Sequence, residues 1–471
     1  MFLSLSEAAS NKDTFDCCIA GTGPAGLSLA LSLGQSNRKI LLLEGGGDEW
    51  SEESQEIYSG QVIGDPYFDL DAARLRYFGG TSDIWGGLCR TLDENDFLPK
   101  PGFAGLHWPI RKADLTPYFD KAADILEIPK IPGDKVLDPD SGVTQIYFEY
   151  SPPVRFAEKY RQDIEKSDNI FLCLNANVTC INTNGFRVED LDVESFDGTK
   201  VKLDARKFII AAGGIENSRL LLWSNEKNNG RLVNKMSPLG LYWMEHPHFT
   251  IGGAIIGSLS SEQTYFSLTP DKQQELGILN CRLALRPAYH GWQRKLITDL
   301  GCVAPKLGTW AMSQFGKRLI CGARLTAAWE QEPRADNRIQ LSRTVKDRFG
   351  VPKTELYWSK SEVDLKTVRE TAFQFGKYLI NTNNGRIKLE DWVLGEGDYP
   401  ANDALAGFHH MGGTRMASDP ANGVVDENGK VFGQENLYVL GSSVFPTGGH
   451  VNPTLSIVQL ALRLSDHIAK S

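Results

Sequence analysis

The chain has 471 residues, of which 41% are hydrophobic and 23% are charged, a composition typical of a globular protein with two or three domains. Its formal net charge of −9 excludes a general basic surface of the kind that binds nucleic acid. We expect a soluble, cytoplasmic protein without a membrane span, because no apolar run reaches about 18 residues and the first segment, MFLSLSEAASNKDTFD, has no signal-peptide pattern.

Eight cysteines are scattered along the chain, and none forms a CxxC pair or a Cys/His cluster with the spacing of metal ligands. Cys17 and Cys18 lie within the first expected strand, where small apolar side chains pack well. We therefore expect reduced, buried thiols and no metal site, in agreement with a cytoplasmic setting.

The first predicted elements are a strand, a glycine-rich turn and a helix. Asp16–Ala20 has the apolar run of a buried parallel strand, and Pro24–Leu33 has the pattern of the helix that follows it. Lys39–Leu43 predicts a second strand. This order of elements is typical of the beginning of a nucleotide-binding α/β domain.

The turn between the first strand and the helix carries a GxGxxG pattern, formed by Gly21, Gly23 and Gly26. The first glycine permits a tight turn, the second lets backbone N–H groups approach a pyrophosphate, and the third lets helix and strand pack closely. Glu44 ends the second strand 18 residues after Gly26, where a carboxylate can accept the ribose hydroxyls. The pattern predicts a site for the ADP half of a dinucleotide but does not separate FAD from NAD.

Two later strands favour FAD, and one further segment is suited to ligand contact. Residues 74–90, RLRYFGGTSDIWGGLCR, form a glycine and aromatic segment suited to backbone contact with a ligand. The segments 207–214 (KFIIAAGG) and 437–442 (LYVLGS) are strands that end in small residues. In a simple NAD site the chain does not need to contact the cofactor again at several distant segments. FAD needs such contacts, because its flavin ring extends far from the adenosine.

The remaining elements are a helix over 108–126, a helix in the middle of 151–171, alternating strands over 172–210, and helices over 362–379 and 452–469. No internal repeat or low-complexity stretch interrupts them.

Two polar residues near the C-terminal end suggest chemistry. Oxidation of an alcohol needs a group that removes the hydroxyl proton, and a neutral imidazole suits this task at physiological pH. A second polar group should hold the developing alkoxide. His410 and Asn452 fill these roles if the fold brings them together. Alternatively, His409 and His410 form a turn without chemistry, and Asn452 caps the helix that begins near Pro453.

These motifs together resemble those of the glucose–methanol–choline (GMC) oxidoreductase family, and the resemblance covers nearly the whole chain. GTGPAG with Glu44 is similar to the family's FAD fingerprint, and GGTSDIWGG is similar to the segment beside the isoalloxazine ring. HHMGGTRM and HVNPTLSIVQLALRLSDHI resemble its two active-site segments.

The resemblance implies an α/β fold with two domains, a Rossmann-like FAD domain and a substrate domain with an antiparallel sheet. The FAD domain is expected to be discontinuous and to comprise residues 1–98, 155–237 and 405–471. The substrate domain is expected to comprise residues 99–154 and 238–404.

The resemblance also assigns site residues. In the family the first active-site histidine stands three residues before a Gly-Thr pair, which here is Gly413-Thr414 and points to His410. The NPT sequence places Asn452 at the second position. The expected cofactor contacts come from the glycine turns and strand ends: Gly21, Gly23, Pro24, Ala25, Gly26, Glu44, Gly80, Thr81, Ser82, Trp85, Gly86, Val178, Ala212, Gly213, Gly441, Ser442, Asn452, Pro453 and Thr454.

Four other histidines have less defined roles. His450 and His409 are expected to line the substrate pocket, although His450 also competes for the role of base. His246 and His248, in the sequence MEHPH, are further candidates for a place near the reaction.

Non-covalent FAD is expected. Fungal pyranose 2-oxidases attach FAD through a histidine just before the tryptophan of this segment. Here Ile84 precedes Trp85, so that bond cannot form.

The segments VFPTGGHVNPTLSI, GGIENSRLLL and EQEPRADNRIQLS resemble the sugar-oxidising members, which are the pyranose and C-glycoside oxidases and the large subunits of gluconate and fructose dehydrogenases. We therefore expect oxidation of a secondary alcohol of a sugar or glycoside, with the proton passing to His410 and hydride to flavin N5. The electron acceptor is expected to be oxygen, or a quinone or cytochrome. The alternatives are a catalytic subunit of a membrane-linked dehydrogenase with a small partner subunit, and a redox-silent lyase or decarboxylase.

Overall fold

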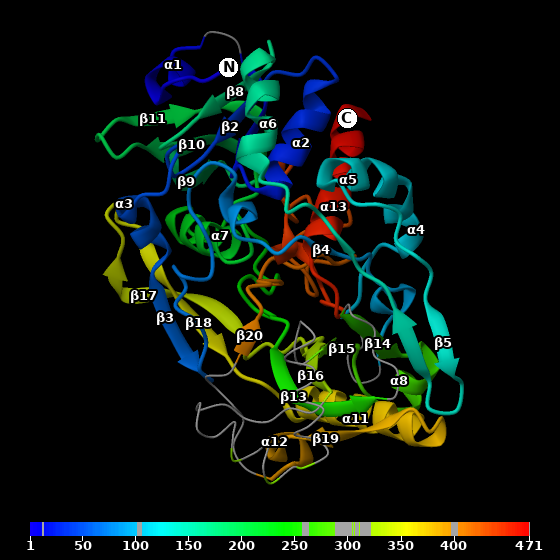
Figure 1. Ribbon diagram of the computed structural model, residues 1–471. Coiled ribbons are helices and arrows are strands. Elements are labelled where there is room, and N and C mark those ends of the chain that lie inside the picture. The colour runs from blue at the N-terminus through cyan, green and yellow to red at the C-terminus, as the bar shows by residue number, and fades with distance from the viewer. Residues whose placement is uncertain are drawn as a thin grey trace.

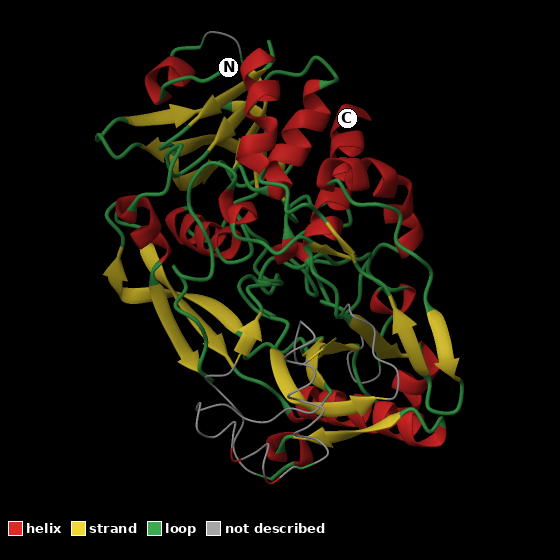
Figure 2. Cartoon of the chain, viewed as in Figure 1, coloured by secondary structure: helices red, strands yellow, loops and turns green. Residues whose placement is uncertain are grey.

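The structure is a computed structural model that describes residues 1–11, 14–100, 106–256, 263–287, 322–396 and 404–470, together with positions 304, 306 and 310. Helices gather around one sheet in the upper part of the molecule, and a second sheet occupies the lower part (Figure 2). The site lies where these two parts meet.

The upper sheet has five parallel strands taken from distant parts of the chain (Figure 1). Every neighbouring pair is parallel. Such strands are covered on both faces, and this explains their continuous apolar sequences. In spatial order the strands are β21 (Leu437–Val439), β12 (Ala205–Ile210), β1 (Phe15–Ala20), β2 (Ile40–Leu43) and β8 (Ile170–Cys173).

Helix α2 (Pro24–Gly34) follows β1 and packs against α13 (Thr454–Lys470) and α6 (Phe156–Lys166). The N-terminal strand and the C-terminal helix are thereby brought together, and buried residues of both belong to one hydrophobic core. A three-stranded antiparallel sheet extends this part, with β9 (Asn177–Thr183), β10 (Val188–Glu194) and β11 (Lys200–Leu203); α7 (Glu216–Lys227) packs on β9, and α1 (Leu5–Ala9) on β11.

The lower sheet has eight strands, and all of its pairs are antiparallel. Helix α11 (Glu362–Asn381) packs against it and shares a second core with it. The main path runs β19 (Gly385–Leu389), β13 (His248–Ile256), β16 (Ala323–Trp329), β15 (Cys281–Pro287), β14 (Thr264–Leu268), β6 (Val143–Ile146) and β5 (Lys135–Asp138), and β20 (Ala404–Ala406) pairs with β13.

The prediction of a parallel α/β part and an antiparallel sheet is therefore confirmed. The exact division of the chain stays a prediction, because a third sheet joins segments expected in different domains. In it β3 (Gly60–Gly64) pairs in parallel with β18 (Pro352–Trp358), which also pairs with β17 (Arg338–Lys346). A small core around Trp243 lies at this junction.

The remaining short elements are α3 (Glu52–Gln55), α8 (Pro270–Leu276), α12 (Asp391–Leu394), and β4 (Leu88–Cys89) paired with β7 (Glu149–Tyr150). One expected helix differs from the structure. Residues 108–126 form α4 (Lys112–Leu115), a 3₁₀ turn over 116–118 and α5 (Phe119–Leu126). Pro117 accounts for the break, because proline has no N–H to continue the helical ladder.

Six of the eight cysteines are described, and all six are free and buried, as expected. Cys302 and Cys321 lie outside the described residues. Over the part of the chain that the structure describes, no helix combines the length and hydropathy that a bilayer crossing requires.

Candidate active site

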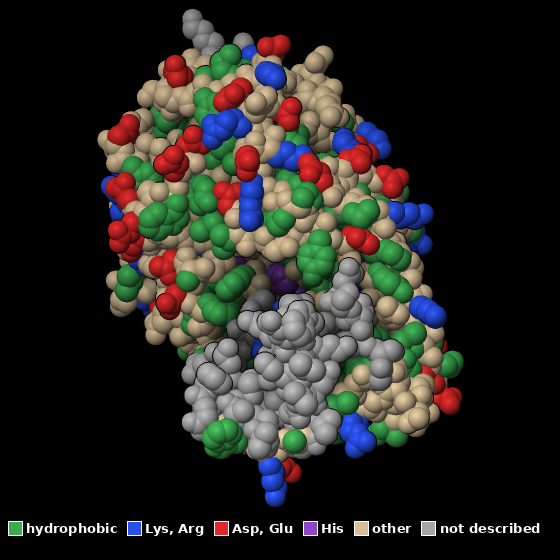
Figure 3. Space-filling model, in the orientation of Figure 1, with side chains coloured by type: hydrophobic (Ala, Val, Ile, Leu, Met, Phe, Trp, Pro, Cys, Tyr) green, Lys and Arg blue, Asp and Glu red, His purple; other side chains and the backbone are tan. Residues whose placement is uncertain are grey.

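A cavity of about 570 Å³ is lined by both sheets, with Ala20 and Leu43 from the parallel one and Ala284 and Ala328 from the antiparallel one. Histidine side chains are visible at the bottom of the hollow on the face shown in Figure 3. All the predicted cofactor contacts except Gly26 line this cavity, so segments that are far apart in sequence share one wall.

The glycine turn explains why the end of the cavity near β1 is open. Gly21 has φ +111°, and a Cβ there would lie 2.3 Å from the Ala211 carbonyl oxygen. A Cβ on Gly26 would lie 1.9 Å from the Gly21 carbonyl oxygen, so only glycine lets the helix approach the strand. Gly23 has no protein atom within 4 Å of its Cβ position, which leaves its backbone open to a ligand at the N-terminus of α2.

Glu44 is held at the cavity wall by the same turn. One carboxylate oxygen accepts hydrogen bonds from the Thr22 N–H at 3.2 Å and from the Thr22 hydroxyl at 2.6 Å. The other accepts the Gly46 N–H at 3.0 Å. These bonds fix the carboxylate beside the turn, and each oxygen retains acceptor capacity for a sugar hydroxyl.

The two adjacent histidines face different surroundings. The His409 Nε2 lies 3.2 Å from the Asn452 Nδ2, and its Nδ1 lies 2.9 Å from the His246 Nδ1. The His410 Nε2 lies 3.0 Å from the Tyr67 hydroxyl, and its ring is 5.9 Å from the Trp243 ring.

His410 and Asn452 both line the cavity, as expected, but the hydrogen bond of Asn452 is to His409. Successive side chains of an extended segment point to opposite sides. A backbone bridge determines which histidine faces which side: the Met244 N–H donates to the Met411 carbonyl at 2.8 Å, and the Met411 N–H donates to the Met244 carbonyl at 3.0 Å.

The contacts of Asn452 determine which nitrogen of His409 carries a proton. The Arg282 Nη1 donates to the Asn452 Oδ1 at 3.0 Å, and a guanidinium can only donate. The amide nitrogen of Asn452 therefore faces His409, whose Nε2 is the acceptor. The Nδ1 of neutral His409 then carries the proton and donates to His246.

Electrostatics keep His409 neutral. Its ring is half-buried by the protein around the cavity, and burial lowers its pKa well below the usual range; the nearby His246 and Arg282 lower it further. Burial also lowers the pKa of His246 to about 3, with a further contribution from Arg282. Both rings are therefore without positive charge at neutral pH, and the His409 Nε2 lone pair accepts the Asn452 N–H.

A buried carboxylate supports this arrangement from behind. The Tyr67 hydroxyl donates to Glu245, so the Tyr67 oxygen accepts the Nε2–H of His410. Glu245 also accepts the backbone N–H groups of His246 at 2.7 Å and His409 at 2.9 Å. Burial raises the pKa of Glu245 to about 7, although these donors oppose the shift. In this hydrogen-bonding pattern His410 acts as a donor rather than as a free base.

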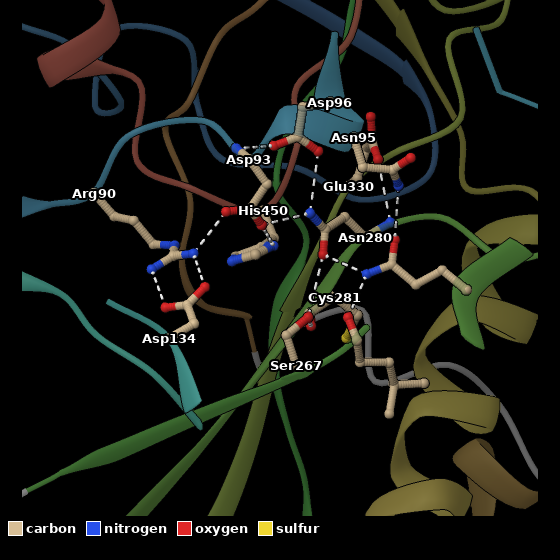
Figure 4. A network of polar contacts seen from close by, with 12 residues as sticks. Arg90, Asp93, Asn95, Asp96, Asp134, Ser267, Asn280, Cys281, Glu330 and His450 are labelled. Carbon is tan, nitrogen blue, oxygen red and sulfur yellow. Dashed lines mark hydrogen bonds and ion pairs between the residues drawn. The ribbon is translucent and has the colours of Figure 1, made fainter. Parts of the chain in front are cut away.

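His450 does not line the cavity, contrary to expectation. Its ring is fully buried beside Phe148, and its Nδ1 lies 3.8 Å from the Asp93 carboxylate. Figure 4 shows it at the edge of a polar network in which Asn280 donates to Asp93 and Asp96. Burial lowers the pKa of His450 to about 3. His248, in contrast, lines the cavity from β13.

Comparison with known proteins shows what the chain is similar to. The family model GMC oxidoreductase matches residues 333–461. The chain is 23% identical to 2-methyl-1,2-propanediol dehydrogenase of Mycolicibacterium austroafricanum, over 98% of this chain and 96% of that protein. It is 26% identical to the fructose dehydrogenase large subunit of Gluconobacter japonicus, over 56% of this chain and 47% of that one.

The crystal structure of pyridoxine 4-oxidase, from the organism named as Mesorbium loti, has a similar fold, with a TM-score of 0.59 at 16% identity over 96% of this chain and 99% of that one. Residues 333–461 are therefore those of a GMC oxidoreductase C-terminal region, and the chain as a whole is similar to dehydrogenases and oxidases of alcohols and sugars. It is an enzyme that acts on CH–OH groups, and its cofactor is FAD.

The cavity fits a dinucleotide of that kind. The open Gly23 backbone, the fixed Glu44 carboxylate, Asn452 and His409 all line it. Among the described residues, no group of three or more His, Cys, Asp or Glu side chains is arranged to hold a metal ion.

Sequence reasoning missed several residues of the cavity wall. Arg74 and Glu216 form a buried ion pair at 2.9 Å, and both line the cavity. Glu216 follows the GG turn of GGIENSR, which is a local signal, whereas Tyr58 and Arg282 line the cavity from segments without a motif.

Proposed function

We propose that the protein oxidises a secondary alcohol of a sugar or a related polyhydroxy compound, with His409 as the group that accepts the hydroxyl proton. The observation that supports this proposal is the hydrogen bond between His409 and Asn452 inside the cavity. The match to the large subunit of a fructose dehydrogenase supports a sugar-like substrate.

Each residue has a defined task in this proposal. The substrate hydroxyl takes the place of the Asn452 N–H at the His409 Nε2, which then accepts the hydroxyl proton. The Nδ1–H of His409 stays bonded to His246, which holds the ring in place. The Asn452 amide turns its N–H toward the substrate oxygen and stabilises the charge that develops there. Bound FAD supplies the hydride acceptor. Arg282 fixes the orientation of the Asn452 amide, because it can bond only to the oxygen.

In this proposal His410 is a structural residue of the cavity wall and not the base. Its ring nitrogen is engaged by Tyr67, and the ring packs beside Trp243, so it shapes the wall behind His409. It was the expected base on spacing, and it is therefore the matched control for the test.

The test is anaerobic mixing of the FAD-loaded enzyme with a panel of sugars, glycosides and simple alcohols, followed by the loss of flavin absorbance. His409→Ala should slow the reduction by about 10²- to 10⁴-fold, as expected for loss of a general base. His410→Ala should have a much smaller effect. Full reduction rates in His409→Ala, or the larger loss in His410→Ala, would reject the assignment. Absence of bleaching by every alcohol would favour a redox-silent lyase or decarboxylase.

We also propose a second candidate, a catalytic subunit of a membrane-linked dehydrogenase with a small partner subunit. The match to a protein named as a large subunit favours it. Co-purification with a small protein, and reoxidation by a quinone or cytochrome but not by air, would support this candidate, whereas fast reoxidation by oxygen would contradict it.

A further inference from the structure

Arg282 is a buried cation on the substrate side of the cavity. It lies on β15 of the antiparallel sheet, and its side chain is 4% exposed and lines the cavity. Apart from the bond to Asn452, its guanidinium lies over aromatic rings, at 4.8 Å from the Phe148 centroid and 5.7 Å from that of Tyr265. Among the described residues, one bond and two rings leave most of its five donors without a polar partner.

No carboxylate of a described residue lies within ion-pair distance of Arg282, and this distinguishes it from the buried Arg74, Arg90 and Arg219. Arg415 is also buried without an ion pair among the described residues, but it does not line the cavity. Arg74 pairs with Glu216 at 2.9 Å, and Arg90 pairs with Asp134 at 2.6 Å. A buried charge is costly to desolvate unless a counter-charge compensates for it. In a cavity that binds a substrate, the missing counter-charge can come from the ligand.

The position of Arg282 relative to the proposed base restricts where that charge would lie. Arg282 and His409 bond to opposite ends of the Asn452 carboxamide, so a substrate oxygen at His409 lies close to the guanidinium. Arg286 is two strand positions beyond Ala284 on the same face of β15, is exposed, and lines the cavity nearer the solvent. One buried cation matches a monoanion better than a phosphate dianion.

We propose that Arg282 binds a carboxylate group of the substrate, so that the enzyme oxidises the hydroxyl group of a sugar acid or another hydroxy acid in preference to that of a neutral sugar. This inference rests on the proposed oxidation at His409. The carboxylate forms charge-assisted, paired hydrogen bonds with the guanidinium. It is not changed in the reaction, in which the carbinol loses its proton to His409 and its hydride to the cofactor.

The first test compares matched substrates on the FAD-loaded wild-type enzyme without air. D-gluconate should reduce the flavin with a higher kcat/KM than D-sorbitol or D-glucose. D-glucose 6-phosphate tests whether Arg282 binds a phosphate group instead of a carboxylate. If the neutral compounds react as well as D-gluconate, or if the phosphate ester reacts better, the carboxylate assignment is wrong.

The second test uses variants. Arg282→Gln should lower kcat for both kinds of substrate, because Arg282 orients the Asn452 amide. In addition it should raise KM for the carboxylate substrate by about 10- to 100-fold, the loss expected for hydrogen bonds to a charged group, whereas KM for a neutral alcohol should change much less. Arg282→Lys, which keeps the charge, should recover part of the loss. Arg324→Gln is the matched control, because Arg324 is an exposed arginine on the neighbouring strand and does not line the cavity. An equal change of KM for both substrates in Arg282→Gln would show that Arg282 only orients Asn452, and would overturn the proposal.

A third measurement separates failure of this inference from failure of the proposed function. Succinate carries carboxylates but no hydroxyl group, and its binding can be followed by the change in the absorption spectrum of bound FAD. Binding to the wild type and loss in Arg282→Gln would support the carboxylate site even if no alcohol bleached the flavin. Absence of succinate binding, together with bleaching by neutral alcohols, would overturn the inference and leave the proposed oxidation intact.

Discussion

Replacing Asn452 with aspartate keeps the shape of the side chain but puts a negative charge beside the proposed base. The new carboxylate would lie about 3 Å from both the His409 Nε2 and the Arg282 Nη1, because the carboxamide lies 3.2 Å and 3.0 Å from these atoms. At an effective dielectric constant of about 20, two unit charges at that distance interact by roughly 5 kcal/mol. Sharing the carboxylate with Arg282 reduces the part that acts on His409.

The expected result is a new dependence of activity on pH. In the wild type the pKa of His409 is lowered by burial and by positive neighbours, so the base stays unprotonated and kcat/KM should be level through pH 6.5. An adjacent carboxylate favours the protonated ring, and we expect activity of Asn452→Asp to fall as pH decreases, with the midpoint moved upward by about 1 to 3 on the pH scale.

The assay is the pH profile of kcat/KM for flavin reduction between pH 5 and pH 8. Loss of the amide donor should also lower the rate at the plateau, by about 10²- to 10³-fold if it stabilises developing charge. Asn452→Ala is the control, because it removes the same donor without adding a charge. If Asn452→Asp has the level profile of the wild type, then Asn452 and His409 do not interact in the working enzyme and the reasoning is refuted.

Three further predictions concern the cofactor and stability. Gly26→Ala should destabilise the apoprotein by about 1 to 3 kcal/mol, because its Cβ would overlap the Gly21 carbonyl oxygen. Gly23→Ala should leave apoprotein stability unchanged and weaken FAD binding, because no protein atom lies near its Cβ position. Equal melting temperatures of the two apoproteins would contradict this prediction. Acid precipitation should release all the FAD into the supernatant, since Ile84 offers no attachment point, and a yellow pellet would contradict non-covalent binding. The urea midpoint should fall as pH decreases from about 6.5 toward 3, because the unfolded chain takes up protons on histidines that stay neutral in the fold; a midpoint independent of pH over that range would show that these rings are not buried in neutral form. The histidines whose pKa burial lowers to about 3 are His246, His248, His410 and His450.

The parts of the fold that local sequence determines were predictable. The glycine turn of Gly21, the strand before it and the helix after it follow from residue types that few other conformations accept. The closing helix follows from the apolar periodicity of residues 454–470. The prediction of a single helix over 108–126 was wrong, because it rested on apolar periodicity and Pro117 interrupts the helix.

The site was predictable in composition but not in detail. Two adjacent histidines can be aligned with a glycine-rich motif in two ways, and sequence spacing favoured His410. The side that each ring faces depends on the bridge between Met244 and Met411, which is a tertiary contact. Arg282 had no sequence signal at all, because an arginine in an alternating strand is usually a solvent-facing residue.

Glu245 links two segments that are far apart in the sequence. Its carboxylate receives the backbone N–H groups of both His246 and His409, so the spacing of those two rings is set by one side chain rather than by either loop alone. Any attempt to engineer a new substrate range by exchanging loops with another oxidoreductase would therefore have to transfer the 245–248 segment and the 408–411 segment as a matched set. Exchanging one segment without the other would leave the Glu245 carboxylate without its present backbone N–H donors and would change the positions of the His246 and His409 rings relative to each other.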